Sequence, residues 1–577
     1  MITAQEVLQR ALDGSLEGAT LVDLDLAGAR LDGARLGGAT LLRVRLDAAS
    51  LVGASMEGAH VLEGSLKDAR LDGARLTGAQ LARVSLVGSS LDGASLEGAL
   101  LADLDAAGAS LGAAQLKGAR LLGVRAEGLE FRAGRLEGVQ FVRCALQGLR
   151  LGEVTLVKCS FVGSTLTGAR FGRSVHQEGD FSQASLGGAA LDEAQLEGAL
   201  FLGTDLVDAT LPQALSGARF VRAALDPAPP PEAPPGGRRW QGFSLTHAVF
   251  EGLTLDRHSF AGCDLTMTAF LNCSLRGADF TGARGAATSF QGCDLSAATL
   301  SRAQLSSATF SASRLDGARL NEVTFERCQL IGSPLRGVYL DGASLLDTGL
   351  SDSPLEAVSL RGARLRGIDF DGLDLRGLDL EGLSLRRCSF VDARLDGVSL
   401  KRCDLSGADF TRASMVGASL DDAVMTFAKA SHAALTRATL TGAQARGVDF
   451  SHADLTHTRF GRATVDRAMF TMSTLRESDL GGVSGVGTLW RHATLTGASL
   501  VGALLRDADF SHATLDGAVF SDAVLDRAVF HHVRDAGALY DGASTRGLTR
   551  DQLERLEAEA WAPPKHLVDT LNNTPEG

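Results

Sequence analysis

The 577-residue sequence is poor in tyrosine and tryptophan, with two and three residues respectively, and it has no long hydrophobic run. A membrane-spanning helix needs about 18 or more consecutive apolar residues, and no such stretch occurs. The first residues, MITAQEVLQRALDG, also lack the basic start and apolar core of a signal peptide. We therefore expect a cytoplasmic protein that does not contact a membrane.

Neither acidic nor basic residues dominate the sequence. The chain has 69 acidic and 56 basic residues, a formal net charge of −13, and neither sign forms a long block. This balance argues against a basic surface for nucleic acid, so we expect no direct nucleic-acid partner. Cysteine is sparse, and eight thiols without a secretion signal indicate free thiols in a reducing compartment.

Catalytic motifs are absent from the sequence. It contains no nucleophile elbow, phosphate-binding loop, HExxH helix or zinc-finger spacing. We therefore predict that the protein is not an enzyme, and we assign no catalytic residue, no cofactor and no metal site.

The sequence contains instead a repeat of five residues. Between residues 16 and 211 every fifth position is Leu, Phe, Met or Val, apart from Ala106, Ala126 and His176. The frame slips by one residue after Pro212, and the register resumes at Phe220. It then holds from Trp240 to Phe530, with weak points at Gly285, Ala430, Ala445 and Gly485. Alanine is common two residues before this central position, and glycine is common two residues after it. A period of five matches neither a helix nor a strand.

The stretch LAGARLDGARLGGATL, residues 26–41, illustrates the pattern A-x-L-x-G. This pattern resembles the pentapeptide-repeat family, and the resemblance covers most of the chain. It implies an all-β fold, a right-handed quadrilateral parallel β-helix with four pentads in each coil. Central residues and the small residues two before them would point inward, and the other positions would face solvent.

A four-sided coil also predicts that residues four pentads apart stack, because four pentads make one turn. In the series from residue 250 to 530, taken at every fourth pentad, only Leu330, Leu350 and Ala430 lack an aromatic ring. A shorter series runs through Phe141, Phe161, Phe181 and Phe201. We expect each series to form an internal ladder of rings at about the 4.8 Å spacing of neighbouring strands.

The pattern divides the chain into five segments. We predict an N-terminal capping helix over 1–14, a first β-helix block over 15–225, a proline-rich linker or extruded loop over 226–239, a second block over 240–545, and a C-terminal capping helix with a flexible tail over 546–577. The segment 226–239 holds six of the twelve prolines, which cannot donate to a ladder. Either the β-helix continues past an extruded loop or two blocks meet there, and we favour two blocks packed end to end.

Two helix-start signals support the caps. Thr3 with Glu6, and Thr549 with Gln552, have the spacing of a capping box. A cap is needed because an open β-helix exposes strand edges. Family members often dimerise through a terminal cap, so a homodimer is compatible with the sequence.

All eight cysteines lie two residues before a central position, where a thiol replaces the usual alanine. We interpret them as buried small hydrophobic residues. Cys273 and Cys293 would stack in neighbouring coils, close enough for a disulfide under oxidising conditions.

Five histidines are spaced by four pentads or a multiple of four, with Met472 in the gap, and each lies two residues after a central position. We expect them to form a stripe along one edge of the β-helix. One interpretation is a metal-binding or pH-sensitive edge; the other is a duplicated repeat that kept its SHA or RHA tripeptide. The residues are His432, His452, His492, His512 and His532.

The resemblance implies two functions of different kinds. The first is a rod-like protein-interaction scaffold with an unknown protein partner, of the type that acts as an accessory or effector-loading factor of bacterial secretion systems. The alternative is a DNA mimic that binds a type II topoisomerase such as gyrase through an acidic surface. Mimicry requires dense charge of one sign, whereas Arg and Asp alternate in LRGARLRGIDFDGLDLRGLDL, residues 360–380. We therefore favour the scaffold.

Overall fold

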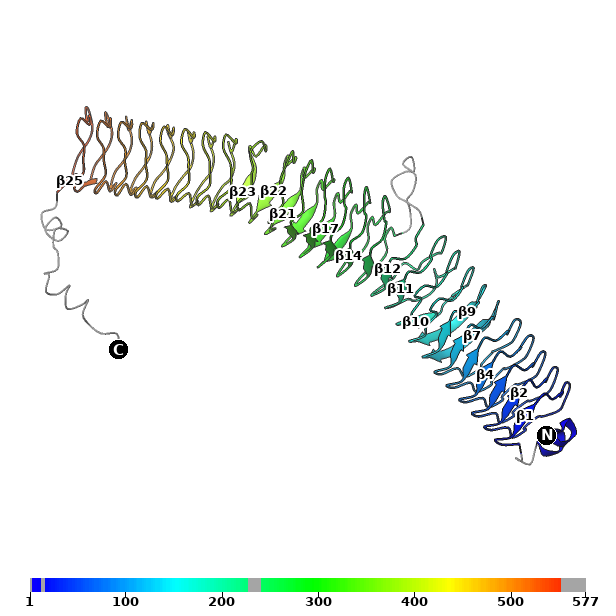
Figure 1. Cartoon of the computed structure of the whole chain (residues 1–577). Coiled ribbons are helices and arrows are strands. Elements are labelled where there is room, and N and C mark those ends of the chain that lie inside the picture. Colours follow the sequence, from blue (N-terminus) through cyan, green and yellow to red (C-terminus); the bar gives the residue numbers. More distant parts are fainter. Residues whose placement is uncertain (1–2, 12–15, 227–239, 552–577) are drawn as a thin grey trace, which may run out of the picture. The chain divides into compact units, whose positions relative to one another are not determined.

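The computed structural model of the protein describes residues 3–11, 16–226 and 240–551 (Figure 1). These residues form a parallel β-helix preceded by one short helix. Thr20 pairs with Thr40, four pentads further along the chain, so four pentads complete each coil. The quadrilateral parallel β-helix predicted from the sequence is confirmed. Among the described residues, none of the helices is long and apolar enough to cross a membrane.

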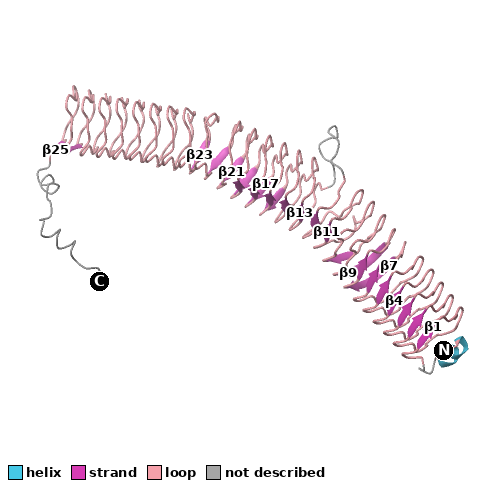
Figure 2. Cartoon of the chain, in the orientation of Figure 1, coloured by secondary structure: helices cyan, strands magenta, loops and turns pink. Residues whose placement is uncertain are grey.

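The chain divides into two compact units, Met1–Ala318 and Arg319–Gly577. The proline-rich segment 226–239 lies within unit 1. In both units short parallel strands lie side by side on the coil walls, as the magenta arrows of Figure 2 show.

Unit 1 holds the helix α1 (Ala4–Arg10) and four sets of strands. The first set is β1 (Thr20–Val22), β2 (Thr40–Leu42), β3 (His60–Leu62), β4 (Gln80–Ala82), β5 (Leu100–Ala102), β6 (Arg120–Leu122) and β8 (Gln140–Val142). The second is β7 (Glu130–Glu137), β9 (Arg150–Val157) and β10 (Val175–Gln177). The third is β11 (Leu200–Leu202), β12 (Arg219–Val221), β13 (Val249–Glu251), β14 (Ala269–Leu271), β16 (Ser289–Gln291) and β18 (Thr309–Ser311), and the fourth is β15 (Arg284–Ala286) and β17 (Gln304–Ser306).

Unit 2 has fewer named strands, because most of its coils pair through single-residue bridges. Its strands are β19 (Thr324–Glu326), β20 (Gln329–Ile331), β21 (Ser344–Leu346), β22 (Arg364–Arg366), β23 (Ser384–Arg386), β24 (Val529–Phe530) and β25 (Thr549–Arg550).

Tight turns make the corners of the coil. At a typical corner the Ala29 N–H donates to the Leu26 carbonyl over 3.1 Å, and Gly28 between them has φ of 66°. A turn with positive φ at its third residue is a type II turn, which favours glycine there. This requirement explains why glycine recurs two residues after the central position.

Backbone hydrogen bonds join each coil to the next. The N–H groups of Leu26 and Gly28 donate to the carbonyls of Arg45 and Asp47 over 2.7 and 2.8 Å. The Arg45 N–H donates back to the Leu24 carbonyl over 2.9 Å. Central and small residues are buried between these walls, as Leu51 and Ala54 at 0% exposure illustrate. The inward and outward positions predicted from the pentad are confirmed.

The aromatic rings form an internal ladder in unit 1. Phe141 and Phe161 stack with their centroids 5.0 Å apart, and Phe250 and Phe270 stack at 4.9 Å. The two series expected from the sequence are one column here, because Phe220 stacks on Phe201 at 4.9 Å and on Phe250 at 5.2 Å. The frame slip after Pro212 had hidden Phe220 from the count of every fourth pentad.

Strand pairing passes the proline-rich segment without a break. β12 pairs with β13, and Phe220 lies opposite Phe250, a register step of six pentads instead of four. This direct pairing fits the alternative in which the β-helix continues past an extruded loop. Residues 227–239 themselves lie outside the described residues.

The helix α1 covers the first coil. Thr3 and Glu6 form both hydrogen bonds of the capping box, and Val7 is buried. At the other end the expected helix start at Thr549 is replaced by strand β25, because the repeat continues and the Thr549 N–H donates to the Ala528 carbonyl over 3.0 Å. Gln552 and the rest of the expected C-terminal helix lie outside the described residues.

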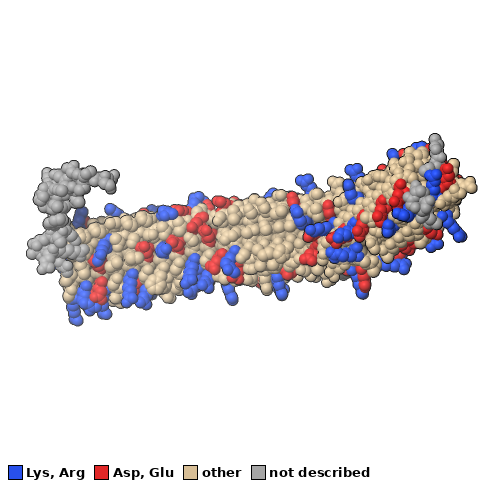
Figure 3. Space-filling model, turned by 90° about the horizontal axis from the view of Figure 1, so that it is seen from below, with Lys and Arg blue, Asp and Glu red and all other residues tan. Residues whose placement is uncertain are grey.

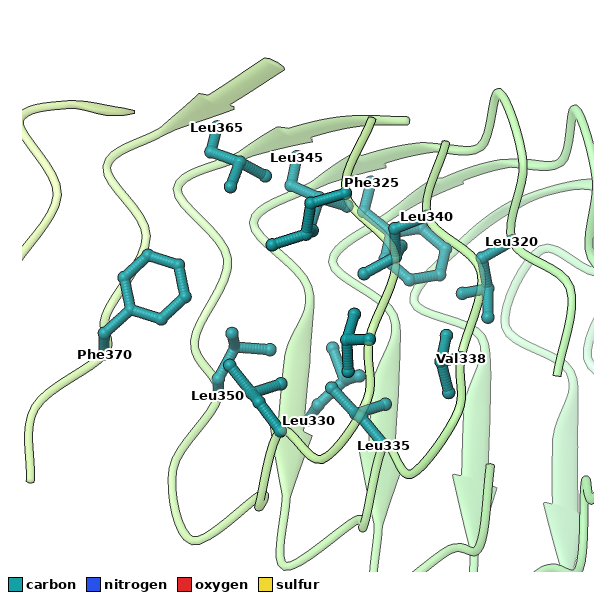
Figure 4. A pocket seen from close by; sticks show the side chains of 13 residues that line it. Leu320, Phe325, Leu330, Leu335, Val338, Leu340, Leu345, Leu350, Leu365 and Phe370 are labelled. Atoms are coloured by element: carbon teal, nitrogen blue, oxygen red, sulfur yellow. The ribbon is translucent and has the colours of Figure 1, made fainter. Parts of the chain in front are cut away.

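Unit 2 has an apolar cavity of about 20 Å³ where its aromatic column is interrupted (Figure 4). Leu330 and Leu350 occupy column positions in which a leucine fills less space than a ring. Phe370 follows at one end of the cavity. A cavity of this size has room for about one water molecule, but the lining offers that water no polar partner.

The substitution Leu350→Phe should fill this cavity and stabilise the protein. The added ring would stack on Phe370, and filling about 20 Å³ recovers about 0.5 kcal/mol, while an aromatic pair contributes about 0.5–1.5 kcal/mol more. Urea unfolding of the full chain measures the change. The same swap at Leu405, which is fully buried and does not line the cavity, is the control and should cost about 1–3 kcal/mol; destabilisation by Leu350→Phe would contradict the account of the cavity.

Candidate functional surface

The expected histidine stripe lies on one corner of the coils of unit 2. All five histidines and Met472 have φ between 54° and 61°, the left-handed conformation of the turn residue. The side chain therefore leaves the corner, and neighbouring coils repeat the same geometry. We name this set the histidine edge: His432, His452, Met472, His492, His512 and His532.

The edge consists of stacked pairs. His432 and His452 stack with centroids 4.6 Å apart and planes 4° from parallel, and His492 and His512 stack at 4.7 Å and 5°. Met472, 51% exposed, occupies the position between the pairs. His532 departs from the stack, with its ring turned by 73° against His512.

The stacked pairs limit the chemistry of the edge. Neutral imidazole is a good ligand for Zn²⁺, but zinc sites in proteins use three or four protein ligands. In the part of the chain that the structure describes, no group of three or more His, Cys, Asp or Glu residues is arranged to hold a metal ion. The edge thus presents pairs of imidazoles and a thioether to solvent.

A sixth histidine lies on another corner of unit 2 and was not singled out from the sequence. His457 has its Nδ1 3.5 Å from an oxygen of Glu477, one coil away. The four-pentad spacing of the two residues was the signal that would have found the pair.

His176 in unit 1 is the one histidine at a central position, and it is fully buried. Its Nε2 lies 2.9 Å from the hydroxyl of Ser174, and its ring contacts Phe171 and Phe181. Burial lowers the pKa of His176 to about 3. This serine–histidine pair cannot reach a substrate, because Ser174 is also fully buried.

The cysteines occupy the inward position predicted from the sequence, and all eight are buried free thiols. The Cys144 and Cys263 thiols donate to carbonyls of the preceding coil, Leu121 and Trp240, over 3.2 and 2.7 Å. Burial raises the pKa of Cys144 to about 11 and that of Cys263 to about 12. A hydrogen bond between the two thiols, together with burial, also raises the pKa of Cys293 beside Cys273. Protonated, enclosed thiols are poor nucleophiles and poor ligands.

Charged side chains on the outward faces pair with the opposite sign. Several close pairs join residues four pentads apart on neighbouring coils, such as Arg43 with Asp23 at 2.6 Å and Arg527 with Asp507 at 2.6 Å. In Figure 3 basic and acidic side chains are interspersed along the face shown. Each unit therefore carries mixed charge of the kind that LRGARLRGIDFDGLDLRGLDL indicated.

A coil built from five-residue repeats, with small residues inward and turn residues at left-handed corners, defines the class of protein. A family model described as pentapeptide repeats matches the chain over more than half of its length, and the chain belongs to this family. The matched residues are 15–60, 65–103, 180–215, 244–282, 288–327, 355–390, 388–426, 403–442, 418–456, 446–482, 473–511 and 503–534.

Several solved structures are similar to this chain. HetL, a pentapeptide repeat protein of Nostoc sp. strain PCC 7120 involved in heterocyst differentiation regulation, is 21% identical over 49% of this chain and 92% of its own, with a TM-score of 0.15. QnrB1, a plasmid-mediated fluoroquinolone resistance protein, is 18% identical over 35% of this chain and 99% of its own, with a TM-score of 0.17. Rfr23 of Cyanothece 51142 is 21% identical over 19% of this chain and 67% of its own, with a TM-score of 0.12. No curated protein matches the sequence.

Zinc should bind the histidine edge weakly, because each stacked pair supplies two ligands. We expect a binding free energy well below the ~10 kcal/mol of a structural zinc site, measured by calorimetry of the full chain at neutral pH. The variant His432→Ala/His452→Ala removes one pair and is the comparison. Tight binding that this variant weakens would show that a further ligand joins the edge.

Replacing His176 by leucine should remove part of the acid sensitivity of unit 1. In the unfolded chain this histidine takes up a proton below pH 6.5, but in the folded chain it does so only near pH 3. The free energy of unfolding therefore decreases as the pH is lowered from 6.5 towards 3. At pH 5 the loss is about 2 kcal/mol at about 1.4 kcal/mol per pH unit. Urea unfolding at pH 7 and 5 should show a smaller loss for His176→Leu than for the wild type. The exposed His452→Ala is the control, and an equal loss in all three proteins would contradict this role of His176.

Proposed function

We propose that this protein is a non-enzymatic protein-interaction scaffold. The supporting observation is that one backbone repeats while its outward side chains vary. On the corner column of the histidine edge, Arg412 precedes the histidines, and Asp392 precedes Arg412, all with φ between 54° and 61°. Outward residues can therefore change without altering the coil, and the display is fixed in register by the hydrogen bonds beneath it.

Two features favour a partner that is a protein. Surfaces of mixed, paired charge suit specific contacts rather than a phosphate backbone. Several large apolar side chains are exposed on unit 2, among them Phe427 at 69% and Met472 at 51%. Exposed aromatic and methionine side chains are enriched at protein interfaces.

The proposal extends to a cytoplasmic accessory or effector-loading factor of a bacterial secretion system. This finer role comes from the resemblance to long members of the family. The DNA-mimic alternative is less well supported, because coil-to-coil pairs such as Arg412 with Asp392, at 2.6 Å, interrupt any acidic column.

Affinity capture with the immobilised full chain, followed by mass spectrometry, tests the proposal. We expect a small, reproducible set of proteins that is retained at physiological salt and is absent with the urea-unfolded chain as bait. Recovery of secretion-system components would support the finer role. Recovery of gyrase subunits would favour the mimic, and capture of nothing beyond the control would contradict the scaffold.

A further inference from the structure

One wall of unit 1 loses its corner turns over two successive coils. In the coils before and after, the Ala114 N–H donates to Leu111 and the Ser174 N–H to Phe171, both over 3.1 Å. Residues 131–136 and 151–156 form no such turn bond, and they run straight through the long strands β7 and β9 (Figure 2). In β7 Gly134 has φ of 129° and is exposed, although its place in the pentad is the one where an inward alanine usually stands.

The two straight strands match each other but not the coil below. β7 pairs with β9 along its length, and Gly152 is needed there because a Cβ would collide with the Arg132 carbonyl oxygen. Below β7 the chain at Leu111–Leu116 still turns the corner. β7 does not pair with this segment, whereas β9 stays paired with β10 of the next coil.

The separation leaves backbone groups of β7 and of the facing segment 109–116 without hydrogen bonds across the gap. In a regular coil, Arg45 bonds the coil below through both its N–H and its carbonyl. Among the described residues, no backbone hydrogen bond joins residues 109–116 to residues 130–136. The unbonded groups are the carbonyls of Ala109 and Ala114 and the N–H groups of Leu111, Ala113 and Leu116 on one side, and the N–H and carbonyl groups of Glu130 and Arg135 on the other.

A cleft lies along this gap in two parts of about 610 and 410 Å³. Residues of β7 and of the facing segment 109–116 line this cleft, and Ala113 and Ala133 border both of its parts. We name it the β7 slot. It differs from the cavity of unit 2 in being open to solvent and lined with polar groups.

The charge of the β7 slot is acidic. Five carboxylates line it, Asp92, Glu97, Glu127, Glu130 and Glu137, against the cations Lys117, Arg132 and Arg135. Each of these basic side chains forms an ion pair with a carboxylate of the slot. Arg132 pairs with Glu130 at 3.1 Å, and Lys117 and Arg135 pair with Glu137 at 3.8 and 3.6 Å. The excess of carboxylates suits a ligand with positive charge.

We propose that the β7 slot binds an extended segment of a partner protein, with basic side chains, as an additional strand between the two coils. The inference rests on the proposed scaffold function and names where such a partner docks. An inserted strand satisfies donors and acceptors on both of its edges, a recognised mode of peptide binding. The slot also explains how an open strand edge is tolerated, because the facing coil leaves access for a single strand and blocks another sheet.

Hydrogen exchange tests the slot in the free protein. The amides of Leu111, Ala113 and Leu116 should exchange faster than those of Leu91, Gly93 and Leu96, which occupy the same positions one coil earlier and are bonded to the next coil. Equal protection of the two sets would overturn the proposal.

Binding is measured by fluorescence anisotropy with a labelled ten-residue peptide of alternating valine and lysine. We expect it to bind the full chain and to slow exchange at Leu111, Ala113, Leu116, Glu130 and Arg135. Valine–glutamate and alternately N-methylated peptides should bind at least about tenfold more weakly, equivalent to about 1.4 kcal/mol, since the first opposes the charge and the second lacks backbone donors. Absence of binding, binding without slowed exchange, or equal binding of the N-methylated peptide would overturn the proposal.

A closed-slot variant restores both corners with a sequence that the chain already uses, LDGARL at residues 31–36 and 71–76. It carries Arg132→Asp, Ala133→Gly, Gly134→Ala, Gly152→Asp, Glu153→Gly and Val154→Ala. It should lose peptide binding and gain protection at Leu111 and Leu116. The exposed Arg30→Asp changes the net charge by the same amount outside the slot and should bind as the wild type does.

The same variant separates the two proposals. If wild type and closed-slot variant capture the same proteins in equal yield, the slot is wrong and the scaffold stands. If the closed-slot variant loses proteins that Arg30→Asp retains, the slot is supported. If the wild type captures nothing above its control, the scaffold proposal fails irrespective of the peptide result.

Discussion

The corner turn is the constraint on which the rest of the structure depends. Each coil must bend after every central residue, and the bend requires a residue with positive φ, supplied by glycine or by a polar residue such as Asp392 or His452. When neighbouring coils bend alike, their backbones stay in register and hydrogen bonds join each coil to the next. When two coils lose the bend together, as at β7 and β9, they remain paired with each other and separate from the coil below. The ladder is interrupted below β7 and continues above β9, where β9 pairs with β10.

The sequence predicts the repeating parts of this protein well, because they follow from one period. The inward cysteines follow from the five-residue period, and the stacked aromatic rings and the alignment of the histidine edge follow from counting by four pentads; the structure confirms all three. The count fails where the period changes. Phe220 was left out of both aromatic series because a single deleted residue shifts the count, and the expected helix start at Thr549 was wrong because a capping-box spacing can also occur within one more pentad.

The β7 slot could not have been predicted from the same count. Phe131 and Leu136 occupy successive central positions, so FRAGRL at residues 131–136 has the pattern of an ordinary repeat. The signal lies in glycine at the inward position of Gly134 and in the β-branched run at Val154 and Thr155, which favours a strand over a turn. Whether a corner is lost depends on the neighbouring coils, since β7 and β9 stabilise each other in the straight form. Such mutual dependence is a property of packing, and a repeat pattern does not contain it.

The stacking of Phe220 on Phe250 has a consequence for how proteins of this kind can grow. The pairing of strands depends on which coils lie against each other. The number of residues between the paired strands can vary, because extra residues can leave the coil at a corner. A step of six pentads is accepted where four is usual, and the rings still stack at 5.2 Å. A corner is therefore a natural insertion point, where a new peptide or a whole domain can be added while the core composition stays the same. Chains with this architecture can acquire appendages one corner at a time, without redesigning the coils that carry them.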